Sequence, residues 1–253
     1  MNYNLYCPLT EEQFEKVMQA MLAHTSQMDR VAYHLAVKAQ AQANAILLRR
    51  FIEPGLPEEF KYVLMYRLGR ISNGVQVEPE QGQRYVIYPE DIGCLKSFWP
   101  ENSLIVGDAP HPDDTEIALG FPFSILADAA RNNAVHSRVM TIGYRVVIKG
   151  VSDDDLQTKI EIRQSEAQAG AEILGVDTQF LNHPAALNGV GFAFYTYRVN
   201  KEMPAEEKAR LGREEQAIVT EHLMVLWQSA GKEGGGLFNP EESDKHPDHQ
   251  YSR

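Results

Sequence analysis

From Ser103 onward, short apolar segments alternate with segments of helical periodicity, and this alternation constrains the fold more than any other feature of the chain. SLIVGDA, at 103–109, has a β-branched centre and is typical of a buried strand. The expected strands are 103–109, 136–148 and 176–181, and the expected helices are 123–132, 156–174 and one that begins at Pro204. Strands separated by helices indicate a parallel sheet with crossover helices. We therefore predict an α/β fold with a Rossmann-like parallel sheet.

The chain before this alternation has mainly helical patterns. Thr10 is a candidate N-cap, a break is expected near Thr25-Ser26, and Pro54-Gly55 ends the helical region. A shorter helix is predicted from Pro57 to Leu68, with Gly69 after it. We divide the chain into a helical N-terminal region at 1–74, a connecting segment of short strands at 75–102 and an α/β domain at 103–253.

The second half of the helical region has its own apolar stripe. Its members recur at helical spacing and are Val31, Leu35, Ala39, Ala43, Ile46 and Leu47. These N-terminal helices offer a surface through which the chain could form a homo-oligomer.

Composition and charge exclude several classes of protein. The net charge of −11 argues against a broad nucleic-acid-binding face, because phosphate contacts need clustered Lys and Arg. No apolar run approaches the roughly 18 residues that span a bilayer, so we expect no membrane segment. The chain has two cysteines, Cys7 and Cys94, which do not form a disulfide framework and favour a cytoplasmic location.

Two similar polar segments carry histidine and aspartate residues that could bind a metal ion or transfer protons. The first, DAPHPDDTEIALG at 108–120, follows the first expected strand, and the second, KHPDH at 245–249, lies near the end of the chain. In parallel sheets, ligands bind beyond the carboxyl ends of the strands. Histidine nitrogen and carboxylate oxygen are good zinc ligands, and a catalytic zinc takes three protein ligands and a water molecule. The two segments therefore indicate a metal site for hydrolysis.

Each segment also has a simpler interpretation. The first could be an Asp-rich turn that caps a helix, and the second a solvated polar tail. Arg163 is a further candidate residue outside these two segments, and it could be a helix-surface charge paired with Glu166 or Asp155.

Taken together, the segments PHPDDTE and KHPDH resemble the PIG-L/LmbE family of zinc-dependent N-acetylglucosaminyl deacetylases. The segment IRQSEAQAGAEILGVDTQFL at 162–181 is similar to the family's Arg-x-x-Glu helix and the strand after it. The resemblance covers about residues 103–253. The sequence departs from the family pattern at Thr115, which stands where a glutamate is usual, and at Phe121, which replaces the second glycine of a pair.

The resemblance implies a role for each of these residues. It implies that zinc, or another divalent metal, is bound by His111, Asp114 and His249. It implies that Asp113 is the general base, that His246 stabilises the oxyanion or protonates the amine, and that Asp248 orients His246. Arg163 corresponds to a substrate-binding arginine, and Glu166 to a residue that anchors its helix.

The function implied is removal of an N-acyl group, most simply acetyl, from a small amino sugar or its conjugate. Because the chain ends four residues after His249, where the family continues, we interpret the domain as truncated at its C-terminus. The alternatives are a non-catalytic binding protein or incomplete fragment on the same fold, and a related amide or ester hydrolase.

Overall fold

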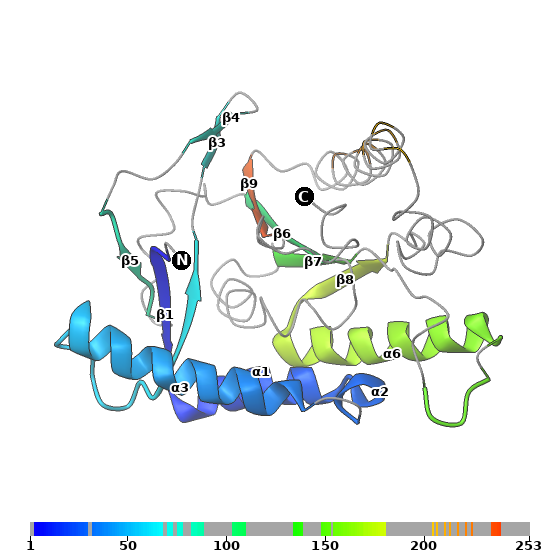
Figure 1. Cartoon of the computed structure of the whole chain (residues 1–253), viewed down its shortest axis with the longest axis horizontal. Helices are drawn as coiled ribbons and strands as arrows, with labels where there is room; N and C mark the ends of the chain where they lie inside the picture. The colour runs from blue at the N-terminus through cyan, green and yellow to red at the C-terminus, as the bar shows by residue number, and fades with distance from the viewer. Residues whose placement is uncertain are drawn as a thin grey trace.

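The computed structural model shows a mixed α/β protein that contains a small mixed sheet, a second sheet of parallel strands and several helices (Figure 1). The residues that the structure describes are 3–29, 32–67, 70–72, 75–77, 82–88, 103–109, 134–138, 148–152, 154–180 and 234–238, with seven single positions from 204 to 224. Among these residues, no helix is both long enough and apolar enough to cross a bilayer.

The N-terminal part combines three helices with a three-stranded sheet. The helices are α1 (Glu11–Leu22), α2 (Thr25–Met28) and α3 (Tyr33–Phe51). The strands are β1 (Leu5–Leu9), β2 (Tyr62–Tyr66) and β5 (Tyr85–Val86), in the order β2-β1-β5. β1 is antiparallel to β2 and parallel to β5, and a separate antiparallel pair is formed by β3 (Arg70–Ser72) and β4 (Val75–Val77). The predicted helices are therefore accompanied by strands.

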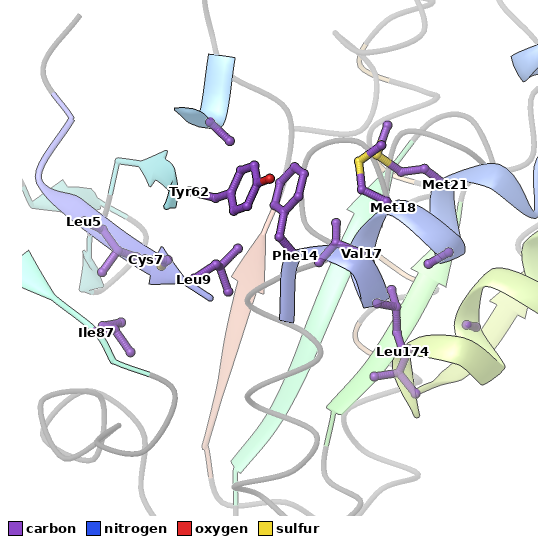
Figure 2. Packing of buried hydrophobic residues seen from close by; sticks show 14 residues of the cluster. Leu5, Cys7, Leu9, Phe14, Val17, Met18, Met21, Tyr62, Ile87 and Leu174 are labelled. Carbon is purple, nitrogen blue, oxygen red and sulfur yellow. The ribbon is translucent and has the colours of Figure 1, made fainter. Parts of the chain in front are cut away.

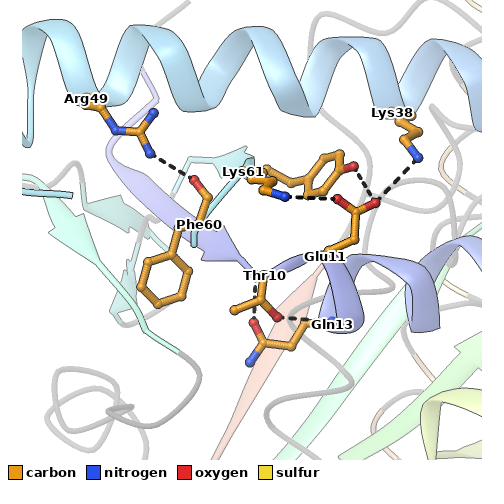
Figure 3. Close-up of polar contacts among 8 residues, drawn as sticks. Thr10, Glu11, Gln13, Lys38, Arg49, Phe60 and Lys61 are labelled. Carbon is orange, nitrogen blue, oxygen red and sulfur yellow. Dashed lines mark hydrogen bonds and ion pairs between the residues drawn. The ribbon is translucent and has the colours of Figure 1, made fainter. Parts of the chain in front are cut away.

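Helix α1 begins where the sequence predicts. The side chain of Thr10 accepts a hydrogen bond from the backbone N–H of Gln13, and the Gln13 side chain accepts one from the Thr10 N–H (Figure 3). This reciprocal pair is a capping box, which satisfies two donors that the first helical turn leaves without partners. The prediction of Thr10 as N-cap is confirmed.

The predicted helix from Pro57 to Leu68 is wrong, because Tyr62–Tyr66 forms strand β2. The run YVLMY contains aromatic and β-branched residues that favour strands, and short apolar runs do not distinguish a strand from a buried helix. Pairing with β1 along all five residues and packing against α3 decide the outcome. Asn44 of α3 also donates a hydrogen bond of 3.1 Å to the carbonyl oxygen of Val63.

The second sheet contains four strands in the order β8-β7-β6-β9, and every neighbouring pair is parallel. The strands are β6 (Ser103–Ala109), β7 (Ala134–Arg138), β8 (Asp177–Phe180) and β9 (Gly234–Phe238). Helix α6 (Leu156–Leu174) connects β7 to β8 in the chain and packs against β8. The predicted strands 103–109 and 176–181 and the helix at 156–174 agree with β6, β8 and α6. The predicted helix at 123–132 lies outside the described residues.

One apolar core joins the N-terminal part to α6. Residues of β1 and α1 form a single buried cluster with Ala171, Leu174 and Val176 from α6 and the chain just after it. Figure 2 shows Leu174 close to the α1 side chains Val17 and Met21. Phe14 and Tyr62 stack within the same cluster, with ring centroids 4.1 Å apart and planes 4° from parallel. The helix that carries Arg163 is thus covered by residues from the start of the chain.

The apolar stripe predicted on the third helix lies mainly on its exposed face. Leu35, Ile46 and Leu47 are 59%, 65% and 47% exposed, whereas the buried residues of α3 are Ala41, Asn44, Ala45 and Leu48. Leu48 packs in a second cluster with Phe60 and Val63. Homo-oligomer formation through this surface stays a prediction.

Polar contacts fix α1 and β2 beside α3 (Figure 3). The Tyr62 hydroxyl donates a hydrogen bond of 2.8 Å to Glu11, whose carboxylate also lies 3.7 Å from Lys38 Nζ and 4.0 Å from Lys61 Nζ. At the other end of α3, Arg49 donates to three backbone carbonyls, those of Leu56, Pro57 and Phe60. These bonds hold the chain that leads into β2.

Candidate active site

The two His-Pro-Asp segments follow neighbouring strands of the parallel sheet. β6 pairs in parallel with β9, with Gly107 opposite Phe238, so the two strands end at the same edge of the sheet. His111 follows the last residue of β6, Ala109, after one proline, and seven residues separate Phe238 from His246. An extended chain of seven residues spans at most about 25 Å. The topology therefore places the ends of the two strands that precede these segments at one edge of the sheet.

The predicted ligands and catalytic residues themselves lie outside the described residues. This holds for His111, Asp113, Asp114, His246, Asp248 and His249. In the part of the chain that the structure describes, His, Cys, Asp and Glu form no group of three or more that could hold a metal ion. The roles of the six residues stay predictions, and the structure contributes the placement of the strands that precede them.

Strand β9 was not expected from the sequence. In the structure, Gly234–Phe238 is a strand at the edge of the sheet. Glycine is depleted in strands, so the five residues carry little strand signal. The one available signal was position: the first His-Pro-Asp segment follows a strand, and the second could be expected to do the same.

Helix α6 lies between the parallel strands β7 and β8 in the chain. A helix that links two parallel strands runs back across the sheet, so its first turns lie at the carboxyl ends of the strands. Asp155 is its N-cap and accepts a 3.1 Å hydrogen bond from the Thr158 N–H. Hydrogen bonding by the Thr158 side chain, and then by its backbone N–H, lowers the pKa of Asp155. The prediction of a helix at 156–174 is confirmed, and Gly175 is its C-terminal cap.

Arg163 is buried on this helix, with 3% of its surface exposed. The alternative interpretation of Arg163 as a helix-surface charge is therefore wrong. Lys159, one turn earlier on the same face, is 0% exposed. Two buried cations on one face of α6 are costly to desolvate and need anionic or polar partners. The sequence analysis missed Lys159, although its spacing of four residues from Arg163 could have identified it.

Glu166 anchors α6, as the family resemblance implied. Its carboxylate accepts hydrogen bonds from the Thr25 hydroxyl at 2.9 Å, the Ser26 backbone N–H at 2.6 Å and the Ser26 hydroxyl at 2.7 Å. Its partners therefore belong to α2, about 140 residues earlier in the chain. The neighbouring His24 is fully buried.

The fold and the placement of the two segments define a mixed α/β protein with a candidate site at the carboxyl edge of a parallel sheet. A family model, PIG-L, described as GlcNAc-PI de-N-acetylase, matches residues 108–252, more than half of the chain. The chain belongs to this family. The match begins within β6 and leaves the N-terminal helices outside it.

Comparison with other proteins adds one similar structure. The chain is similar to N,N'-diacetylchitobiose deacetylase from Pyrococcus horikoshii, solved with its inhibitor MPG, at 24% sequence identity and a TM-score of 0.34. The match covers 59% of this chain and 46% of that chain, so it spans less than half of the deacetylase's length. No curated protein matches the sequence.

Proposed function

We propose that this chain is a metal-dependent hydrolase that removes an N-acetyl group from an amino sugar or its conjugate. The observation that supports the proposal is the parallel pairing of β6 with β9, because the two His-Pro-Asp segments follow these two strands in the sequence. Membership of the PIG-L family supports the reaction and the class of substrate. The proposal also includes a Rossmann-like arrangement, supported by the four parallel strands and by α6 between β7 and β8.

The donor atoms of the proposed ligands fit zinc. His111 and His249 offer imidazole nitrogens and Asp114 a carboxylate oxygen, a set of three that leaves one position open. Pro110 and Pro112 flank His111, and Pro247 lies between His246 and Asp248, so proline restricts the backbone in both segments. When bound, zinc supplies a Lewis acid toward water and the amide carbonyl.

The remaining residues divide the proton transfers between them. Asp113 takes a proton from the water whose oxygen attacks the amide carbon. His246, oriented by Asp248, stabilises the oxyanion, and a proton passes to the nitrogen as the C–N bond breaks. The products are the free amine and acetate, so the atoms of one water molecule are divided between them. Arg163 binds the sugar or its conjugate group.

Replacing Asp113 tests the assignment of the base. We expect Asp113→Ala to keep the metal content of the wild type and to lose deacetylation of N-acetylglucosamine conjugates by a factor of about 10²–10⁴, the usual contribution of general acid–base catalysis. Released acetate and bound metal are the two measurements.

Asp154→Ala serves as the matched control, because Asp154 is an exposed aspartate in the turn before α6. It should retain full activity. Unchanged turnover in Asp113→Ala would refute the assignment of the base, and a wild-type chain that binds no zinc and releases no acetate would overturn the proposed function.

A further inference from the structure

We infer that Glu166 is a positioning residue for Arg163, and that Thr25 and Ser26 of the N-terminal region hold Glu166 in place. The inference rests on the proposed function, because it gives this contact a role in binding the N-acetylated substrate. It goes beyond the anchoring of a helix, since it makes residues outside the family match part of the machinery that sets substrate affinity.

The contact is strong and specific. Both carboxylate oxygens of Glu166 accept hydrogen bonds: Oε1 accepts from the Thr25 hydroxyl and the Ser26 N–H, and Oε2 accepts from the Ser26 hydroxyl. All three distances lie between 2.6 and 2.9 Å, and Glu166 is 8% exposed. Hydrogen bonds to a charged group are about twice as strong as neutral ones, and solvent screens them less when they are buried.

The contact also holds a part of α6 that lies outside the shared apolar cluster. Helix α1 packs against the C-terminal end of α6, where Ala171 and Leu174 enter the shared cluster. Figure 1 shows α6 extending past α1, with α2 beside its middle part. Glu166 thus fastens α6 between its apolar attachment and the first turns near the sheet edge.

Arg163 depends on this attachment for its direction. It lies three residues before Glu166, so the two side chains leave the helix on the same side. Because Arg163 is buried, with 3% exposure, neighbouring groups restrict its rotamers, and its guanidinium follows the backbone of α6. A small tilt of the first half of α6 would therefore displace the guanidinium relative to the sheet edge.

The test compares two Glu→Gln substitutions on one helix. Glu166→Gln removes the charge and turns an amide N–H₂ toward groups that donate, whereas Glu172→Gln makes the same change at an exposed position. For Glu166→Gln we expect KM for the N-acetylated substrate to rise roughly tenfold, since small misplacements of a binding group have effects of this order or larger. We expect kcat and metal content to change little, because binding is lost equally in the ground and transition states. Glu172→Gln should match the wild type.

Two further variants separate positioning from general stability. Glu166→Asp keeps the charge and should restore part of the lost affinity. The double substitution of Thr25 and Ser26 by alanine should also raise KM, and adding Glu166→Gln to it should raise KM little further, because the substitutions remove one shared contact.

Amide hydrogen exchange gives a readout that does not depend on catalysis. Faster exchange at 156–166 in Glu166→Gln than in Glu172→Gln, together with the rise in KM, would support the inference. Unchanged exchange, or a lower melting temperature with an unaltered KM, would overturn it in an enzyme that is otherwise active. A wild-type chain without deacetylase activity would instead overturn the proposed function, and the positioning role with it, whatever the exchange rates.

Discussion

Phe14 shows how much of the fold's stability depends on single residues of the N-terminal part. It is 1% exposed and stacks on Tyr62, which is also 1% exposed. We expect Phe14→Ala to lower the free energy of unfolding by about 3–5 kcal/mol, because it removes buried apolar area and leaves a cavity. Urea unfolding measures the change.

Phe51→Ala is the matched control, since Phe51 is 72% exposed at the end of α3. Its effect should stay within about 0.5 kcal/mol. Equal losses in the two variants would contradict the placement of Phe14 in the core.

Tyr62, which is buried, and Tyr66, which is half-buried with an enclosed hydroxyl, should make the protein sensitive to alkaline pH. Burial raises the pKa of Tyr62 above its ordinary value of 10.0, and the hydrogen bond to Glu11 adds to this effect. Burial raises the pKa of Tyr66 well above the same value, with a smaller contribution from Cys7. A raised pKa in the folded state means that the stabilisation is complete below pH 10.0 and is lost as the pH rises through the folded-state pKa.

Melting temperatures measured from pH 9 upward check this expectation. The wild type should lose stability above about pH 10, and Tyr62→Phe and Tyr66→Phe should lose less over the same range. Tyr33→Phe, at a side chain 41% exposed, should behave as the wild type does. A loss of stability that is the same in all four proteins would show that other groups cause it.

At the scale of elements, α6 depends on how its chain ends. Gly175 has φ +77°, in the left-handed region that side chains with a Cβ rarely adopt, and its N–H closes the last turn. We expect Gly175→Ala to cost about 1–2 kcal/mol of folding free energy. Gly55→Ala is the control, because a Cβ there would meet its nearest neighbour at 3.8 Å, an ordinary contact. If thermal unfolding shows Gly55→Ala to be less stable than Gly175→Ala, the assignment of Gly175 as the C-terminal cap is wrong.

The sequence predicted elements well where a local signal and the final environment agree. Thr10 and Asp155 accept hydrogen bonds from N–H groups three residues ahead, and Gly175 supplies the left-handed residue, so these helix ends depend on neighbouring residues alone. Strand β6 was predicted because its apolar run is too short for a helix and has a β-branched centre.

The elements that were missed depend on distant partners. Pro8 argued against a strand at Leu5–Leu9, because proline cannot donate to a ladder. In the structure, β5 pairs with Leu5 and Tyr6 alone, so Pro8 lies beyond the stretch that has a neighbour on both sides. Likewise, pairing with β1 makes Tyr62–Tyr66 a strand, and pairing with β6 makes the glycine-rich segment Gly234–Phe238 a strand. Local propensity could not reveal these pairings.

At the scale of the whole molecule, α6 is the element that joins the N-terminal part to the α/β part matched by the family model. The apolar cluster joins α1 to the end of this helix, and Glu166 joins α2 to its middle. Sequence patterns identified both His-Pro-Asp segments, and the family resemblance implied the anchoring role of Glu166. They could not show that Arg163 and Lys159 are buried, since burial depends on how α6 packs.

We propose that two segments more than 120 residues apart in the sequence meet after β6 and β9 to hold one metal ion. A crystal structure of the zinc-loaded chain, with anomalous diffraction at the zinc edge, tests it most directly. We predict one zinc peak per chain, with His111, Asp114 and His249 at about 2.0–2.2 Å. A zinc ion bound without His249, or no zinc peak near the ends of β6 and β9, would contradict the account.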